Sequence, residues 1–219
     1  MIASGSDEAG RGSVIGPLVV ATVVLDQEDE EKFKEIGVKD SKKLSPKRRE
    51  VLSKIIKKNC VSYKVSYLKP KVIDSYVWKR IKMKTLNYLE AKIISKHIMQ
   101  LAPDIAYVDS PYSKPETFKL MIEKILRNNN IKVISANKAE DKWVEVACAS
   151  IVAKVERDKA VRKIAKKYGF FGSGYPSDRR TREFLKEIIS KDGRKYDFVR
   201  WSWKTIDKLS LRQLKLLKI

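Results

Sequence analysis

The stretch VIGPLVVATVVL (residues 14–25) is the longest apolar run in the chain. Its many β-branched residues favour a buried strand. The run is interrupted by Gly16-Pro17 and is too short to cross a bilayer as a helix. Because proline cannot donate a ladder hydrogen bond, we expect Pro17 at the beginning of the strand or at a bulge.

Shorter patterns follow this run and alternate between strand and helix. Apolar runs and strict alternation predict strands over 61–67, 105–110 and 131–136. Helical periodicity predicts helices over 85–101, 116–130, 143–168 and 179–191, followed by a helical tail. Gly169, after Lys166 and Lys167, is a natural helix stop. This order predicts an α/β sheet with helices on its faces.

The chain is strongly basic, which indicates a polyanionic partner. Its 219 residues are 43% hydrophobic, as in a folded globular protein, and 48 Lys+Arg against 27 Asp+Glu give a formal net charge of +21. Lys and Arg that bind phosphates release the counterions condensed on a nucleic acid, so nucleic acid is favoured over an anionic membrane. A thermophile surface is the alternative, although such surfaces usually balance Lys with Glu.

The two cysteines and the N-terminus bear on the compartment. Cys60 and Cys148 are too few for a disulfide scaffold. The start MIASGSDEAG is acidic where a signal peptide would be basic and then apolar. These features predict a soluble, cytoplasmic protein without a membrane segment.

Acidic residues gather where predicted strands give way to loops. Asp7 and Glu8 open the segment DEAGRG (7–12), Asp109 ends a short strand, and the pair Glu140-Asp141 follows another. Ligands collect at the ends of neighbouring strands in α/β sheets. Carboxylates without histidine or cysteine suit a hard cation such as Mg²⁺ or Mn²⁺. His97, the single histidine, lies in mid-helix, so zinc is disfavoured.

Asp7 and Glu8 pose a geometric problem, since successive side chains on a regular strand point to opposite faces. A strand that ends there and turns at Gly10 would swing both carboxylates toward one edge. Taken alone, an Asp-Glu pair before glycine is weak evidence for a site, and a solvated acidic turn is the commoner explanation.

Several motifs together resemble the type 2 ribonucleases H (ribonuclease HII), in the form usual for archaea. They occur in the family's order over nearly the whole chain: DEAGRGSVIGPLVVA, GVKDSKKLS, YVDS, CASIVAKVERD, GSGYPSD and WKT. The sequence departs from the family pattern at Ser6, usually apolar, and lacks a histidine before Trp203-Lys204-Thr205. The family's Lys-Ala-Asp motif reads Lys138-Ala139-Glu140.

The resemblance implies an RNase H-like mixed β-sheet flanked by helices, with a C-terminal helical segment. It implies a catalytic domain over 1–171 and a junction-reading loop with the helical segment over 172–219. The implied enzyme is a metal-dependent endoribonuclease that cuts the RNA strand of RNA–DNA hybrids. It also incises 5′ to ribonucleotides embedded in duplex DNA and leaves 5′-phosphomonoesters, as in replication and ribonucleotide excision repair.

The same resemblance assigns the site residues. Two divalent ions about 3.5–4 Å apart, Mg²⁺ or Mn²⁺, would be held by Asp7, Glu8 and Asp109. A fourth carboxylate completes the set, and Glu140 is favoured over Asp141 because it lies ten residues before Ser150, as the motif requires.

In the family, the loop matching Gly10, Arg11 and Gly12 reads the ribose 2′-OH, and the tyrosine matching Tyr175 packs on the adjacent deoxyribose. Glycines let the backbone approach the sugar, and Arg11 would place a guanidinium among the phosphates. The expected partners are RNA–DNA hybrid and ribonucleotide-containing duplex DNA, bound by a monomer. Two alternatives remain: a non-catalytic nucleic-acid-binding protein on a decayed nuclease fold, and an RNase H-fold nuclease acting on DNA junctions.

Overall fold

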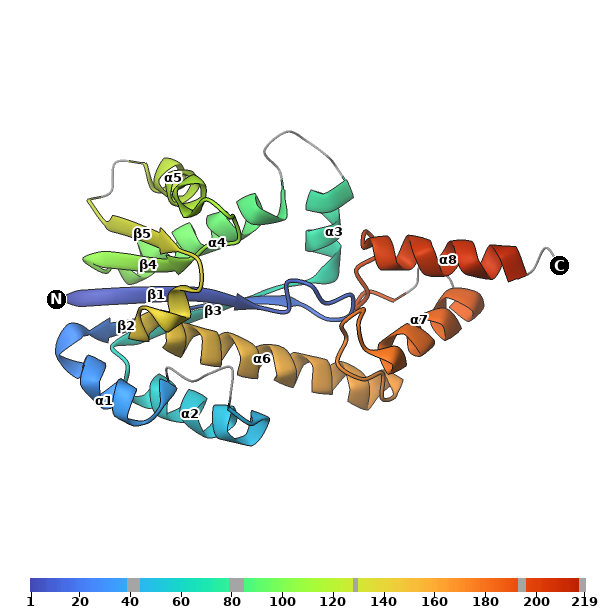
Figure 1. Cartoon of the computed structure of the whole chain (residues 1–219), viewed down its shortest axis with the longest axis horizontal. Helices are drawn as coiled ribbons and strands as arrows, with labels where there is room; N and C mark the ends of the chain where they lie inside the picture. Colours follow the sequence, from blue (N-terminus) through green and yellow to red (C-terminus); the bar gives the residue numbers. More distant parts are fainter. Residues whose placement is uncertain (39–43, 79–84, 128–129, 193–195, 217–219) are drawn as a thin grey trace.

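The fold is a five-stranded mixed sheet between two layers of helices (Figure 1). The computed structural model describes residues 1–38, 44–78, 85–127, 130–192 and 196–216. Lys42 and Lys43 of the motif GVKDSKKLS, where the sequence offers only a weak indication of phosphate contact, lie outside these ranges. The strands are β1 (Ile2–Ala9), β2 (Leu18–Asp26), β3 (Ser62–Leu68), β4 (Ile105–Asp109) and β5 (Lys132–Ala136). The helices are α1 (Glu30–Glu35), α2 (Pro46–Asn59), α3 (Pro70–Trp78), α4 (Leu86–Leu101), α5 (Pro115–Leu126), α6 (Val144–Tyr168), α7 (Arg179–Asp192) and α8 (Lys204–Leu216), with short 3-10 helices η1 (Gln27–Asp29) and η3 (Ala139–Asp141).

The strand order is β3-β2-β1-β4-β5, so β1 lies at the centre of the sheet. β1 pairs antiparallel with β2 and parallel with β4, while β2–β3 is antiparallel and β4–β5 parallel. The predicted RNase H-like α/β class is therefore confirmed. Pro17 immediately precedes β2, as expected for a residue that cannot donate to the ladder.

The apolar run 14–25 is not all strand, which differs from the prediction. β2 begins only at Leu18, and the preceding residues pair with the C-terminal segment through a bridge between Ile15 and Val199. Both parts of the run are buried, so apolarity alone does not separate them.

α6 is the central helix and packs against β1 and β2, with α1 and α2 outside it; α4 and α5 cover the opposite face (Figure 1). The contact between α6 and β1 is close at Gly5, where a Cβ would lie 2.1 Å from the backbone carbon of Glu145. Only glycine fits there, so Gly5 sets how near α6 lies to the strand that carries Asp7 and Glu8.

The predicted helices over 85–101, 116–130, 143–168 and 179–191 correspond to α4, α5, α6 and α7, and α8 confirms the helical tail. The helices α1, α2 and α3 were not predicted. In α2 only Leu52, Ser53 and Ile56 are buried, among many exposed basic residues, so its apolar stripe is narrow. Its clearest local signal is Ser45, whose side chain accepts a hydrogen bond from the Arg48 amide ahead of Pro46.

The C-terminal helices form their own hydrophobic core, which joins the main body through the residues around Ile15. Side chains of α7, α8 and the connecting segment pack on Val14, Ile15 and the end of α6, and Trp201 is buried among them. In Figure 1 these helices lie at the end of the sheet toward which α6 points. The tryptophan thus packs rather than facing solvent.

Ser6, the polar residue at a usually apolar position, is hydrogen-bonded inside the molecule. Its hydroxyl pairs with Thr22 at 2.8 Å, Thr22 with His97 Nδ1 at 3.0 Å, and His97 Nε2 with Ser66 at 2.7 Å. The chain of bonds crosses three strands and α4. Burial lowers the pKa of His97 to about 4, so the ring is neutral at pH 7 and structural.

Glu156 joins α6 to α2 and β3. Its carboxylate accepts hydrogen bonds from Lys57 at 2.7 Å, Lys159 at 2.9 Å and the Tyr67 hydroxyl at 2.6 Å. Burial opposes the charge, but these donors outweigh it and lower the Glu156 pKa from 4.5 to about 2. The carboxylate therefore stabilises the fold in its charged form.

Glu156→Gln is expected to lower the free energy of unfolding at pH 7 by about 1–2 kcal/mol, less than the full displacement of the pKa from 4.5 to about 2 implies, because solvent screens part of the interaction. Because the folded-state pKa is depressed, this stability is present above pH 4.5 and is lost as the pH falls toward 2. Urea unfolding of both proteins at pH 7 and pH 3 measures it. A difference that stays constant between the two pH values would contradict the assignment.

Candidate active site

The site lies where β1 and β4 part. Their parallel pairing stops at Ser6 and Val108, whereas β1 continues beside β2 as far as Ala9. The strand ends at Ala9 and the chain turns at Gly10, as expected. Asp7 and Glu8 are still paired with β2, however, so the expectation that the turn swings both carboxylates to one side is wrong. The edge of β1 toward β4 is open at this point, so side chains on either face can reach the same opening.

The two carboxylates face different layers, as the strand's alternation requires. The Asp7 side chain is hydrogen-bonded to Ser150 on α6, and the Glu8 carboxylate interacts with the charge of Glu90 on α4. Asp7 is 5% exposed, and Glu8 is half-buried. The pair is thus placed at the open edge by strand geometry rather than by a turn at Gly10.

Asp109, the last residue of β4, fixes the neighbouring 3-10 helix. Its Oδ1 accepts a hydrogen bond of 2.7 Å from the amide of Ala139, at the first turn of η3. The next residue, Glu140, is 8% exposed, whereas Asp141 is exposed to solvent. Of the two acids, it is Glu140 that is turned into the protein.

The four carboxylates share one electrostatic environment. The pKa of Asp7 is raised well above its usual value by burial first, then by Glu8, and also by Glu140 and Asp109. The pKa of Glu8 is raised to about 8, again by burial, then by Glu90, with Asp109 and Glu140 contributing. Like charges held this close in a buried site oppose ionisation unless a cation compensates them. The fold brings these residues together from β1, β4 and η3.

Ser150 and Lys154 of α6 support Asp7, and the sequence analysis gave neither residue a role in the site. Lys154 donates a hydrogen bond of 2.7 Å from Nζ to the Ser150 hydroxyl oxygen. An ammonium has no acceptor, so the serine's own proton is free to point at Asp7. Lys154 is one helical turn after Ser150, and this spacing is the signal that could have revealed the pair.

The donor set fits a hard divalent cation. All four groups are carboxylates, and the repulsion that raises their pKa values would be relieved by positive charge. Within the part of the chain that the structure describes, no three His, Cys, Asp or Glu side chains are gathered closely enough to hold an ion as they stand. The carboxylates therefore form an acidic cluster at the open edge of β1, and their side chains are not yet arranged as a metal coordination shell.

The turn after the carboxylates depends on Gly10. Its φ is +84°, and a Cβ would lie 2.9 Å from the Pro17 carbonyl oxygen, so only glycine is accommodated. The guanidinium of Arg11 donates to Glu90 and to Asn87 on α4. Arg11 thus points toward α4. Burial raises the pKa of both Glu8 and Glu90, and the Arg11 charge offsets part of that rise. Its expected contact with phosphates stays a prediction.

Tyr175 lies beside this turn. A Cβ on Gly12 would be 4.0 Å from the tyrosine ring, and the ring is stacked over the Arg157 guanidinium at 4.6 Å. Arg157 also donates to the Ser173 carbonyl at 2.5 Å. It also donates a hydrogen bond to its neighbour Asp158 at 3.2 Å, so it joins α6 to the loop that carries Tyr175.

Asp178 closes that loop. Its carboxylate accepts hydrogen bonds from the amides of Ser173 at 2.8 Å and Arg180 at 3.0 Å, which lower its pKa to about 2. The loop 172–178 is therefore anchored at both ends, and the predicted site residues Gly10, Gly12 and Tyr175 are brought together.

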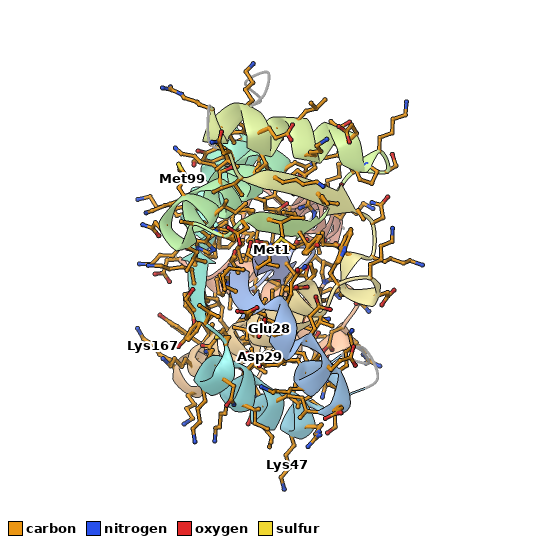
Figure 2. All side chains as sticks on the ribbon, turned by 90° about the vertical axis from the view of Figure 1, so that its left-hand side faces the viewer. Met1, Glu28, Asp29, Lys47, Met99 and Lys167 are labelled. Atoms are coloured by element: carbon orange, nitrogen blue, oxygen red, sulfur yellow. The ribbon has the colours of Figure 1, made fainter. Side chains whose placement is uncertain are left out.

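Basic side chains project around the rest of the molecule. Figure 2 shows Lys47 on α2 and Lys167 on α6 extending away from the body, with nitrogen-tipped side chains around the outline. No helix in the described ranges is both long enough and apolar enough to span a membrane.

A mixed five-stranded sheet with acidic residues at the ends of two neighbouring central strands defines the RNase H-like class of fold. The comparisons then identify the family. A model of the family described as Ribonuclease HII matches residues 4–206. The chain belongs to this family and is a nuclease, a hydrolase of phosphodiester bonds.

Individual relatives agree over nearly the full length. The ribonuclease HII of Archaeoglobus fulgidus is 44% identical over 96% of this chain and 98% of its own. The ribonuclease H2 crystal structure from Pyrococcus horikoshii is 41% identical, with a TM-score of 0.86 over 98% of this chain and 100% of that one. A structure of Bst-RNase HIII in complex with Mn²⁺ shares the fold, with a TM-score of 0.81 at 22% identity over 97% of this chain and 70% of that one.

Proposed function

We propose that this protein is an endonuclease that hydrolyses the RNA strand of RNA–DNA hybrids and incises duplex DNA 5′ to embedded ribonucleotides. The observation that carries the proposal is the adjacency of two features: the buried carboxylates of β1, β4 and η3, and the glycine turn with Tyr175 beside it. The first suits phosphodiester hydrolysis, and the second suits selection of a sugar. The basic surface supplies affinity for the duplex.

The proposed cofactor is a pair of Mg²⁺ or Mn²⁺ ions, which would activate a water and neutralise charge on the transition state. Asp7, Glu8 and Asp109 would hold the ions, and Glu140 would complete the acidic set. Ser150, oriented by Lys154, keeps Asp7 in place by donating a hydrogen bond from its hydroxyl to the carboxylate. Gly5 lets α6 lie close to β1, and the hydrogen bond from the Ala139 amide to Asp109 ties η3 to the end of β4.

Sugar selection is proposed for the segment 10–12 together with Tyr175. The absence of a Cβ on exposed Gly12 leaves space next to the tyrosine ring for the substrate backbone. A 2′-OH both donates and accepts hydrogen bonds, so peptide groups of the turn can distinguish it from a deoxyribose. Arg11 contributes by tying the turn to α4 and by offsetting the negative charge of Glu8 and Glu90.

We further propose that residues 1–171 are the catalytic domain and that residues 172–219 present the junction-reading loop. The separate hydrophobic core of α7 and α8 supports this division, and its packing on Val14 and Ile15 supports close attachment to the catalytic part.

One assay tests the proposed function directly. A DNA duplex with a single embedded ribonucleotide is incubated with Mg²⁺, with Mn²⁺ and with EDTA, and an all-DNA duplex serves as the control. We expect incision 5′ to the ribonucleotide with either metal and none with EDTA. Binding without incision under all conditions would favour a non-catalytic nucleic-acid-binding protein instead.

Tyr175→Ala is expected to slow incision at single ribonucleotides about tenfold or more, and to slow cleavage of a long hybrid much less. The ring lies beside Gly12, and a long hybrid offers many ribose contacts whereas a junction offers one. Stacking of a base on an aromatic ring is worth ~1–3 kcal/mol, and we expect packing of a sugar on the Tyr175 ring to be toward the lower end of that range. Tyr175→Phe, which retains the ring, is the matched control. Equal losses on both substrates would show that Tyr175 only packs the loop.

A further inference from the structure

Arg200 is a fully buried arginine whose hydrogen bonds converge on the glycine turn. It is 0% exposed, and its guanidinium donates from Nη2 to the Gly10 carbonyl at 2.7 Å and from Nη1 to the Arg11 carbonyl at 2.8 Å. Its Nε donates to the Gly16 carbonyl at 3.1 Å, and Trp203 covers the guanidinium at 4.9 Å. A buried charge is costly unless hydrogen bonds compensate it, and here three backbone carbonyls do so.

Arg200 is held in place by the chain around it rather than by the turn alone. Its amide donates to the Val14 carbonyl at 2.9 Å, and the Gly16 amide donates to the Phe198 carbonyl at 2.8 Å. The bridge between Ile15 and Val199 lies between these bonds. The backbone on both sides of Arg200 is therefore held by strand-like pairing with residues 14–16, and this pairing places the guanidinium next to the carbonyls of the turn.

The direction of the two carbonyls determines the direction of two amides. In a trans peptide the C=O of one residue and the N–H of the next point to opposite sides. The described ranges contain no cis peptide bond. Because the carbonyls of Gly10 and Arg11 both point inward to Arg200, the N–H groups of Arg11 and Gly12 point away from it. Gly12 is exposed, so this side of the turn is open to a ligand.

Successive backbone N–H groups that point the same way form a site for an oxygen with negative or partial negative charge. The turn stands next to the carboxylate cluster and beside Tyr175, where a substrate sugar would lie. A 2′-hydroxyl oxygen is a suitable acceptor for such a pair of donors.

We propose that Arg200 is a positioning residue for ribose recognition: it holds the carbonyls of Gly10 and Arg11 so that the amides of Arg11 and Gly12 face the 2′-oxygen of the ribonucleotide. The inference rests on the proposed function and adds a residue far away in sequence. Arg200 does not touch the substrate in this arrangement. It acts through the turn, and so its loss should change the choice of sugar more than the affinity for duplex.

The test compares single-turnover rates of Arg200→Lys and Arg200→Gln with wild type on two substrates: a duplex with one ribonucleotide and a long RNA–DNA hybrid. Neither side chain can satisfy three carbonyls in the guanidinium geometry. The maximal rate at the single ribonucleotide should fall about 10- to 100-fold, the size expected for a misplaced reacting group, with KM for the duplex nearly unchanged. The rate on the hybrid should fall at least about fivefold less.

Asp74→Asn is the matched control. The buried Asp74 carboxylate accepts from the amides of Trp201 at 3.0 Å and Ser202 at 3.1 Å, so its replacement loosens the same segment without contacting the turn. Its ratio of rates on the two substrates should equal that of wild type, and circular dichroism checks that every variant is folded.

The outcomes separate the two proposals. Wild type that fails to incise the single-ribonucleotide duplex contradicts the proposed function, whatever the variants do. Active wild type with an unchanged substrate ratio in both folded Arg200 variants overturns the role of Arg200 alone. The same change of ratio in Asp74→Asn would also overturn it, because general loosening of the segment would then explain the effect.

Discussion

Asp109→Asn is expected to reduce cleavage on the order of a thousandfold or more, since a lost metal ligand removes several kcal/mol of transition-state stabilisation. Asparagine retains Oδ1 and can still accept the hydrogen bond from the Ala139 amide, so η3 should keep its position. Duplex binding should be nearly unchanged, because the basic surface is intact. Single-turnover cleavage with Mg²⁺ and a fluorescence binding assay with EDTA measure the two effects.

Asp104→Asn is the control for this variant. Asp104 immediately precedes β4, at the end away from the carboxylates, and accepts a hydrogen bond from the Ile2 amide at 2.8 Å. It should cleave at close to the wild-type rate. If Asp109→Asn retained more than a few per cent of activity with Mg²⁺, the proposed centre would be wrong.

Asp109→Asn should also make the metal-free protein more stable than wild type at neutral pH. Glu8 has a folded-state pKa of about 8, raised from 4.5, so its contribution to stability is present below pH 4.5 and is lost as the pH rises through 8. Asp109 is one of the charges that raise this pKa. Thermal unfolding in EDTA between pH 5 and 8 should therefore show a smaller fall in Tm for Asp109→Asn than for wild type.

Glu140→Gln is expected to lower the cleavage rate about a hundredfold or more, whereas Asp141→Asn should change the rate little. Glu140 is nearly buried and its charge raises the pKa of Asp7 and Glu8, while Asp141 is exposed and stands one residue further along η3. Glutamate is one methylene longer than aspartate, so it can reach the opening from this position.

Both variants are measured on the single-ribonucleotide duplex with Mg²⁺, and each is the control for the other because they neutralise adjacent charges on one short helix. A large loss confined to Asp141→Asn would reverse the assignment. Equal, small losses in both would mean that the fourth carboxylate comes from elsewhere in the chain.

Local patterns in the sequence were sufficient for the main elements of the fold. The β-branched run before Asp26, the period of α4 and α6 and the stop at Gly169 depend on interactions between near neighbours, so they can be identified without the tertiary structure. The acidic residues at strand ends and the family motifs likewise follow from position in the sequence. The narrow apolar stripe of α2 gave too weak a periodic signal.

The tertiary structure alone decided which side chains meet. Arg11 contacts Glu90 over 79 residues, and Arg200 contacts Gly10 over 190, distances at which no periodic pattern carries information. The sequence placed Asp7 and Glu8 side by side, but the open edge that serves both exists because β4 leaves β1 after Ser6. Charge indicated a polyanionic partner and periodicity determined how the elements form; the convergence of distant backbone and side-chain groups determined the site.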